Sequence, residues 1–385
     1  MTLLRRPAVL LSAFFLLAAG APPQTAALET AASNAGAAVS AGQAAEEVWN
    51  KPYYAAYRSG HSKQPAGRDR LTLDAGQLTA RSADAALLEN YEGKSGRLVR
   101  TSDESDVIFG FSVRAAGLYA LRLTYFAEQG SGNAVRRALY LDGSLPFREA
   151  ADAEFDRVFA DEGGVHYRLD PQGNQIRANA VEARRWREQD VRDPISGDAY
   201  LFYLTAGAHT LRLAPGSESM VIAGIEVCAP EPPGDYADYL RKCEKEYGEN
   251  RGGDRVITIQ AEEIDEKSAA SVYGSCDRQT ADVQPYALYR MVLNELSGAK
   301  FSQPGQWVTY RFYAKEAGYY RLAFKYKQTY KDSGTVNRRI FLDGAVPFAQ
   351  WQALPFHYAD AWESFAAGSD EPQYVYLSKG DHTLT

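Results

Sequence analysis

The sequence is short of the residues that most often carry chemistry. It has 3 cysteines among 385 residues, which is too few for a disulfide scaffold, and the odd count leaves at least one thiol unpaired. The net charge is −7, from 42 basic and 49 acidic residues, which argues against a nucleic-acid binder because such proteins carry basic surfaces. The motifs of serine hydrolases, zinc proteases, thiol–disulfide enzymes and P-loop proteins are also missing. We therefore expect a protein that is not an enzyme.

Tyrosine and apolar residues, by contrast, are abundant. The chain has 25 tyrosines, and hydrophobic residues make up 45% of it, which is enough to build real cores. Aromatic residues suit pleated, half-buried surfaces, so this composition favours β structure.

The first 50 residues have the pattern of an export signal followed by a tether. Arg5 and Arg6 precede an apolar run over residues 8–21, and small residues follow it. The run is shorter than the ~20 residues that a membrane-spanning helix needs. We expect a signal peptide over residues 1–27 and a flexible tether over residues 28–50. The mature protein would then be secreted, at the cell surface or beyond it, with no membrane span.

The rest of the chain repeats itself. Residues 106–148 align with residues 307–349 at a constant offset of 201, and fourteen of these 43 positions are identical. They include Leu141-Asp142-Gly143, which matches Leu342-Asp343-Gly344. A period this long indicates tandem domains, because the units of a solenoid are only about 20–50 residues long.

A second block repeats at a shorter offset. Tyr203 and His209 match Tyr376 and His382 at an offset of 173, so the first copy carries 28 extra residues between the two blocks. This insertion falls near residues 163–193. We interpret the two matching histidines as turn residues that tie down a hairpin, rather than as ligands or bases.

Alternate positions in both copies are apolar, as on the buried face of a strand. The first copy has Tyr119, Leu121, Leu123 and Tyr125, and the second copy has Tyr320, Leu322, Phe324 and Tyr326. Short strands separated by Gly and Pro predict an all-β fold of two tandem antiparallel β-sandwiches of the jelly-roll kind, joined by a short helical linker. A strand over residues 221–227 is expected to complete the first copy.

The repeats and the Pro-rich stretches set the expected boundaries. These are a connector with a short helix at residues 51–70, a first sandwich at 71–228, a linker at 229–255 with a helix from Tyr236 to about Tyr247, and a second sandwich at 256–385. The second copy stops before a counterpart of residues 221–227, so we expect it to be C-terminally truncated, with an open edge. Cys228 and Cys243 are spaced so that they could pair, and the sequence leaves this open.

Several short motifs, in this order, resemble the galactose-binding-like sandwich. They are Gln306-Trp307-Val308-Thr309-Tyr310, Ala317-Gly318-Tyr319-Tyr320, Phe341-Leu342-Asp343-Gly344 and Gly380-Asp381-His382-Thr383-Leu384. Among such sandwiches, carbohydrate-binding modules of families 6 and 35 look closest. The resemblance covers residues 71–228 and 256–385.

A narrower resemblance concerns larger proteins. The export signal, the tyrosine-rich connectors and the two modules together look like the N-terminal half of large extracellular solute-binding proteins of Gram-positive ABC sugar importers. This implies a non-catalytic carbohydrate-binding protein that serves sugar uptake, binds an oligo- or polysaccharide, and reaches an ABC importer permease through a further C-terminal domain. Two other functions stay open: accessory modules of a glycoside hydrolase, and sandwiches with a purely structural role at the cell surface.

A sugar site in such a sandwich needs aromatic faces in loops, because the C–H face of a pyranose stacks on a flat ring while polar groups bond its hydroxyls. In the second copy the candidates are Tyr330, Trp351 and Trp362, with Gln328 and Asn337 as polar partners. In the first copy they are Tyr167 and Trp186, with Asn174.

The same resemblance implies a structural calcium ion, because family 6 and 35 modules often hold one through an early Glu-Ala-Glu strand. The second copy has Gln260-Ala261-Glu262 there, so Gln260 and Glu262 are the candidate ligands. Calcium takes six to eight oxygens, and an amide replaces one carboxylate of the pattern. No other cofactor is expected.

Overall fold

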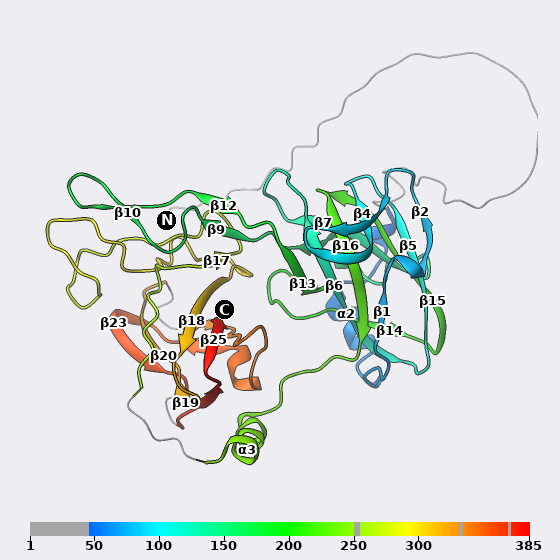
Figure 1. Ribbon diagram of the computed structural model, residues 1–385. Helices are drawn as coiled ribbons and strands as arrows, with labels where there is room; N and C mark the ends of the chain where they lie inside the picture. Colours follow the sequence, from blue (N-terminus) through cyan, green and yellow to red (C-terminus); the bar gives the residue numbers. More distant parts are fainter. Residues whose placement is uncertain (1–45, 250–254, 331–333, 369–370) are drawn as a thin grey trace, which may run out of the picture. The chain divides into compact units, whose positions relative to one another are not determined.

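The computed structural model describes residues 46–249, 255–330, 334–368 and 371–385 (Figure 1). The expected signal peptide and most of the tether lie outside the described residues. The named strands pair antiparallel and the helices are short, which confirms the predicted all-β class. Across the described ranges, no helix is long and apolar enough to cross a membrane.

The first copy is a sandwich of two sheets. The first sheet has the order β13-β6-β16-β4-β3, with β1 beside β16 and β14 beside β6. Its strands are β1 (Leu71–Leu73), β3 (Ala86–Tyr91), β4 (Lys94–Thr101), β6 (Gly117–Ala127), β13 (Trp186–Asp190), β14 (Leu201–Leu204) and β16 (Met220–Cys228). The second sheet has the order β2-β5-β15-β7-β8. Its strands are β2 (Leu78–Arg81), β5 (Val107–Val113), β7 (Val135–Leu141), β8 (Ala153–Phe155) and β15 (Gly207–Ser217).

The core of this sandwich follows from the alternation along β6. Tyr119, Leu121, Leu123 and Tyr125 point inward and are each 0% exposed. Burying a side chain of this size contributes about 1.5–3 kcal/mol relative to leaving it in water. The expected strand over residues 221–227 is confirmed as β16, and it lies in the middle of its sheet, between β6 and β4.

The second copy repeats these pairings in smaller sheets. Its strands are β18 (Val308–Ala314), β19 (Gly318–Arg321), β20 (Ala323–Gln328), β21 (Val336–Arg338), β22 (Leu354–Phe356), β23 (Ala359–Ala366), β24 (Tyr374–Leu377) and β25 (Gly380–Leu384). The pairing of β18 with β25 corresponds to that of β5 with β15, and the pairing of β21 with β22 corresponds to that of β7 with β8. The long strand β6 has two counterparts. β19 pairs with β24 as β6 pairs with β14, and β20 pairs with β23 as β6 pairs with β13.

The matching histidines tie down the Asp-Gly turns, as predicted. His209 Nδ1 lies 2.7 Å from Asp142 Oδ2, and His382 Nδ1 lies 2.7 Å from Asp343 Oδ2. Both aspartates have φ of 50°, the left-handed region that a tight turn requires. In each copy the other carboxylate oxygen accepts the backbone N–H that follows the histidine, at 2.8 Å.

A short helix packs against each sandwich. The helix predicted from Tyr236 to about Tyr247 is confirmed as α3 (Tyr236–Tyr247), which ends at Gly248 with φ of 85°. Its counterpart in the first connector is α2 (Tyr54–Gly60). All three cysteines are free, so Cys228 and Cys243 form no disulfide.

The insertion in the first copy joins a sheet of the second. β9 (Phe159–Asp161) pairs with β12 (Ala180–Glu182) and also with β17 (Glu266–Lys267), so one sheet runs β12-β9-β17-β18-β25. The insertion also contains a hairpin of β10 (Arg168–Leu169) and β11 (Gln175–Ile176). Elsewhere in the described residues there are three 3-10 turns: Ala75–Gln77, Arg148–Asp152 and Ala349–Gln352.

Candidate functional site

Two tryptophans hold the same place in the two copies. Tyr125 of β6 lies opposite the residue that follows Trp186 in β13. Tyr326 of β20 lies opposite the residue that follows Trp362 in β23. Tyr125 and Tyr326 are partners in the repeat, so the strand register makes Trp186 and Trp362 equivalent. Both side chains are half-buried.

Trp186 lies on the outer face of the seven-stranded sheet. Its indole packs against Phe126 with ring centroids 5.7 Å apart. The indole N–H donates to the backbone carbonyls of Glu92 at 3.1 Å and Tyr91 at 3.3 Å, which holds the ring in one orientation. Lys94 Nζ lies 5.3 Å from the ring centroid.

The surface beside Trp186 is apolar at its base and charged at its rim. Leu98, Phe126 and Val221 form a small buried cluster that is separate from the main core. The Glu128 carboxylate, which is largely buried, accepts from Arg100 Nε at 2.7 Å and from the Tyr91 hydroxyl at 3.0 Å.

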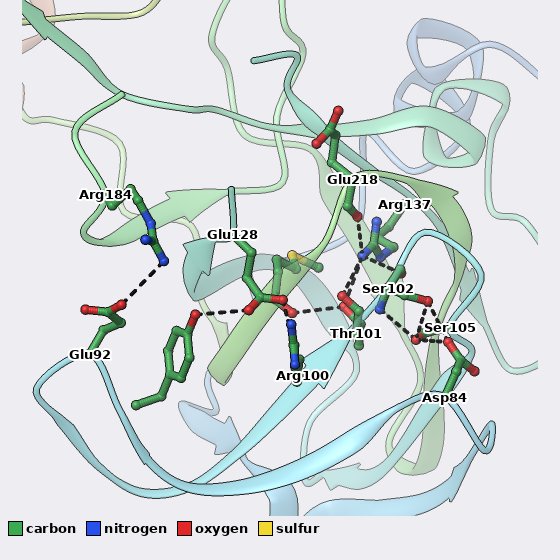
Figure 2. A network of polar contacts seen from close by, with 12 residues as sticks. Asp84, Glu92, Arg100, Thr101, Ser102, Ser105, Glu128, Arg137, Arg184 and Glu218 are labelled. Atoms are coloured by element: carbon green, nitrogen blue, oxygen red, sulfur yellow. Dashed lines mark hydrogen bonds and ion pairs between the residues drawn. The ribbon is translucent and has the colours of Figure 1, made fainter. Parts of the chain in front are cut away.

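The Glu128 carboxylate, which lies beside Arg100 in Figure 2, raises the pKa values of both of its partners. Its hydrogen bond and negative charge raise the pKa of Arg100. Burial raises the pKa of Tyr91, and the Glu128 carboxylate adds to the effect. At one side of this network Arg184 pairs with Glu92 at 3.4 Å. Charged groups and an apolar floor therefore lie within one face.

Trp362 is fixed by a side chain instead of by backbone carbonyls. Its indole N–H donates to Asp277 Oδ2 at 2.9 Å. That hydrogen bond lowers the pKa of Asp277, and the positive charge of Lys327 lowers it further. Asp277 comes from the loop before β18, so the second copy also combines a tryptophan, a carboxylate and a lysine in one place.

Three further residues predicted as sugar contacts in the second copy differ in their exposure and in their position relative to the strands. Tyr330 follows β20 and is 94% exposed. Gln328 is the last residue of β20 and is buried, which corrects its expected place in a loop. Asn337 lies in the middle of β21, exposed and opposite Pro355.

Trp351 is a clear correction. It was expected in a loop with its ring free, but it is 1% exposed and belongs to the core of the second copy. Its ring packs against Phe348 with centroids 4.9 Å apart, and its indole N–H donates to Gln373 Oε1 at 3.0 Å. The ring offers no face to a ligand.

The other residues predicted in the first copy serve to hold the insertion in place. The Tyr167 hydroxyl donates to the backbone carbonyl of Glu262, and burial raises the pKa of Tyr167. Asn174 donates to Asp170 Oδ2 at 2.8 Å and accepts from the Met291 N–H at 2.7 Å. Both side chains are half-buried, so their contacts are structural.

The candidate calcium ligands lie in a turn and not in a strand. Gln260 is half-buried, and Glu262 is 2% exposed with no hydrogen-bond partner for Oε2. Burial raises the pKa of Glu262 to about 7. Within the described ranges, no group of three or more His, Cys, Asp or Glu side chains could hold a metal ion. Calcium takes six to eight oxygens, so these two side chains alone would not complete such a site.

The polar neighbours of the two tryptophans were not predicted. They are Tyr91, Lys94, Arg100 and Glu128 in the first copy and Asp277 and Lys327 in the second. The signal available for the first set was Phe126, which points to the outer side of β6 after the alternating core residues, and Glu128, which follows the strand. A large aromatic ring on an outward position of a strand is a reason to look for a second packed face.

Comparison with known proteins gives matches among solved structures only. No protein-family model matches the chain, and no curated protein matches it. A family 35 carbohydrate-binding module from Clostridium thermocellum aligns at 13% identity over 42% of this chain and 98% of that chain, with a TM-score of 0.27. The C-terminal family 6 module of a marine laminarinase from Zobellia galactanivorans aligns at 13% identity over 42% and 99%, with a TM-score of 0.26. A family 35 module from Cellvibrio japonicus aligns at 14% identity over 42% and 95%, with a TM-score of 0.27.

Proposed function

We propose that this chain binds carbohydrate, with Trp186 and Trp362 as its two stacking surfaces. The observation that carries the proposal is their equivalence: each copy presents a half-buried tryptophan at the same register position of its outer edge strand. A flat ring held by its N–H keeps a face for the C–H groups of a pyranose, and side chains at its rim can bond the hydroxyls.

The chemistry around each ring suits such a ligand. In the first copy Arg100 and Glu128 offer a donor and an acceptor beside the Trp186 floor. Lys94 stands over the ring on a flexible stem, so a bound sugar would displace it and could keep its ammonium as a hydroxyl donor. In the second copy Asp277 and Lys327 have the corresponding roles beside Trp362.

Titration calorimetry of the full chain against soluble plant and microbial polysaccharides tests the proposal. Trp186→Ala and Trp362→Ala should each weaken binding at one site about tenfold, which corresponds to about 1.4 kcal/mol, and the double variant should show this loss at both sites. Trp49→Ala is the matched control, since Trp49 is 70% exposed and lies outside both faces. A folded protein that stays silent across a broad panel would support a purely structural role instead.

The finer role is also a proposal, and it rests on the sequence pattern. We place the protein outside the cell, in a sugar-uptake system whose permease it would reach through a solute-binding domain. The alternative is a role beside a glycoside hydrolase. Purification of the native protein with its partners, followed by assays for glycoside hydrolysis and for sugar transport, separates the two.

A further inference from the structure

The insertion of the first copy and the loop before β18 meet in one exposed region. We call residues 168–177, which contain the hairpin of β10 and β11, and residues 288–293 the tip (Figure 1). The Gln175 N–H donates to the Met291 carbonyl at 2.8 Å, and the Met291 N–H donates to Asn174 Oδ1 at 2.7 Å. Gln175 Oε1 accepts from the Leu293 N–H at 2.6 Å. Residues 117 positions apart in the chain are therefore joined in one unit.

Exposed hydrophobic side chains are concentrated in the tip. Within the described ranges, fifteen large hydrophobic side chains are exposed, and five of them belong to the tip. Their exposed fractions run from 42% to 90%, and they are Leu169, Ile176, Leu288, Tyr289 and Met291. Single exposed hydrophobic residues are ordinary, but a group of them in one place indicates a contact surface.

Polar contacts within the tip fix the backbone that presents these side chains. Asp170 Oδ1 accepts from the N–H groups of Gln172 and Asn174 at 2.9 and 2.8 Å, and its Oδ2 accepts from Asn174 Nδ2 at 2.8 Å. The hydrogen bond from the Asn174 side chain, helped by those from the backbone, lowers the pKa of Asp170. On the other segment, Arg278 donates to the Leu288 carbonyl at 2.9 Å.

The charge of the tip is opposite to that of the whole chain. Arg168, Arg177 and Arg290 are exposed there, and Arg278 adjoins them through its bond to Leu288. The tip has a single acidic residue, Asp170, whose carboxylate already accepts the bonds described above. The chain as a whole has a net charge of −7. A basic, hydrophobic tip on an acidic protein fits an anionic partner.

The register of the hairpin places hydrophobic side chains on both of its faces. Arg168 pairs with Ile176 and Leu169 pairs with Gln175. Paired residues point to the same face and neighbouring pairs to opposite faces, so Leu169 and Ile176 lie on opposite faces. A flat protein surface would cover only one of these faces, whereas lipid surrounds a hairpin that enters it end-on. This register therefore favours a bilayer over a protein partner.

We propose that the tip is a docking site for the surface of an anionic lipid bilayer. Its five hydrophobic side chains enter the boundary between headgroups and acyl chains, and its arginines bond the lipid phosphates. Tyr289 suits this boundary because its ring is apolar and its hydroxyl is polar. The contact is peripheral, since β10 and β11 have only two residues each. This inference is independent of carbohydrate binding.

Co-sedimentation of the full chain with vesicles tests the role of charge. Vesicles of equal parts phosphatidylglycerol and phosphatidylcholine should pellet the chain, and phosphatidylcholine vesicles should bind it at least about tenfold more weakly. Added salt should weaken binding because it screens the arginines. Arg168→Gln and Arg290→Gln should each lower the affinity about fivefold, the effect of one charge near an anionic surface. Arg241→Gln is the control, since Arg241 is exposed on α3, outside the tip.

A second set of variants tests insertion of the hydrophobic side chains. Leu288→Ser combined with Tyr289→Ser should lower the affinity about tenfold or more. Val256→Ser combined with Tyr313→Ser removes two exposed residues of other segments and should leave it unchanged. Tyr289→Trp adds a tryptophan to the native five, and lipids brominated on their acyl chains should quench the added fluorescence.

The outcomes separate this proposal from its alternatives. A folded chain that does not pellet with anionic vesicles would overturn it, and so would binding that the tip variants leave unchanged. If the arginine variants lower binding but Leu288→Ser with Tyr289→Ser does not, the chain only adsorbs to acidic surfaces and the proposal is wrong. If the tip variants dissociate dimers formed without lipid, the tip is a protein interface instead. Trp186→Ala with Trp362→Ala should keep vesicle binding, whatever its effect on carbohydrate.

Discussion

At the scale of single residues, Asp69 shows how one carboxylate can hold two segments together. It accepts from Arg114 Nε at 2.6 Å, from the N–H groups of Arg114 and Ala115, and from the Tyr119 hydroxyl at 3.1 Å. The Arg114 hydrogen bond, helped by these other donors, lowers the pKa of Asp69 to about 2. Only the ionised carboxylate satisfies all of these donors.

The depressed pKa predicts how stability depends on pH. The contribution of Asp69 is present above the unfolded pKa of about 3.9 and is lost as the pH falls from there towards 2. Asp69→Asn should therefore lower the urea midpoint at pH 6, and its deficit relative to the native chain should shrink by pH 3. Exposed Glu104→Gln is the control and should leave the midpoint unchanged. An unchanged midpoint for Asp69→Asn at pH 6 would contradict the prediction.

The residue scale is also where the sequence was least informative. Trp351 and Trp362 look alike in the sequence, since both stand among small and polar residues after Pro347-Phe348. What separates them is burial: Trp351 lies in the core with its indole N–H bonded to Gln373, whereas the half-buried Trp362 bonds to Asp277. The contact of Trp351 with Gln373 joins residues 22 apart, and no local pattern contains it.

At the scale of elements, the connector helices cap the edge strands of their sandwiches. The Tyr54 and Tyr57 hydroxyls accept from the N–H groups of Leu201 and Tyr203 on β14, at 2.9 and 2.8 Å. In the second copy Tyr236 and Tyr239 do the same for Tyr374 and Tyr376 on β24, at 2.9 and 3.1 Å. An edge strand with capped N–H groups cannot recruit another strand on that side.

Removing these hydroxyls should free the edge. Tyr54→Phe and Tyr57→Phe should each cost about 1 kcal/mol of unfolding free energy, because each leaves one N–H without its acceptor while the ring still packs on Phe147. Hydrogen exchange of the Leu201 and Tyr203 amides measures the effect directly. Tyr53→Phe, one residue before α2, should change neither amide.

At the scale of the whole molecule, the sheet that both copies share links their stabilities. Lys267 of β17 and Asp161 of β9 form an ion pair in which both side chains are almost fully buried. Removing one partner of such a pair leaves a charge in a place without water, which costs about 3–5 kcal/mol. Breaking this pair should therefore cost more than breaking an exposed one.

Calorimetry of the full chain tests this link. Lys267→Ala should lower the main unfolding transition and split it, because Asp161 is then buried without its cation. Lys267→Met combined with Asp161→Leu should recover much of the loss, since it removes both charges. Arg255→Ala breaks an exposed pair with Glu316 and should cost at most about 1 kcal/mol. A single transition that Lys267→Ala does not shift would overturn the link.

Most of the architecture was predictable, and the joint sheet was not. The all-β class and the repeat were predictable because their signals are local. These signals are the alternation of apolar residues over 119–125 and 320–326 and the Asp-Gly turns. β9 and β17 are 3 and 2 residues long, too short to show any period. The equivalence of Trp186 and Trp362 was hidden for a similar reason: the insertion interrupts the alignment between its two blocks, and only strand pairing restores the register.

The capping tyrosines also define where each structural repeat begins. Because each helix satisfies the edge of the sandwich that follows it, the structural repeat includes the helix as well as the strands. A recombinant fragment that starts at Leu71 would lose the acceptors for two amides of β14 and uncover Phe147, whereas one that starts at Tyr53 keeps them. A structural alignment of the two copies should likewise start at Tyr54 and Tyr236, the first residues of the two helices.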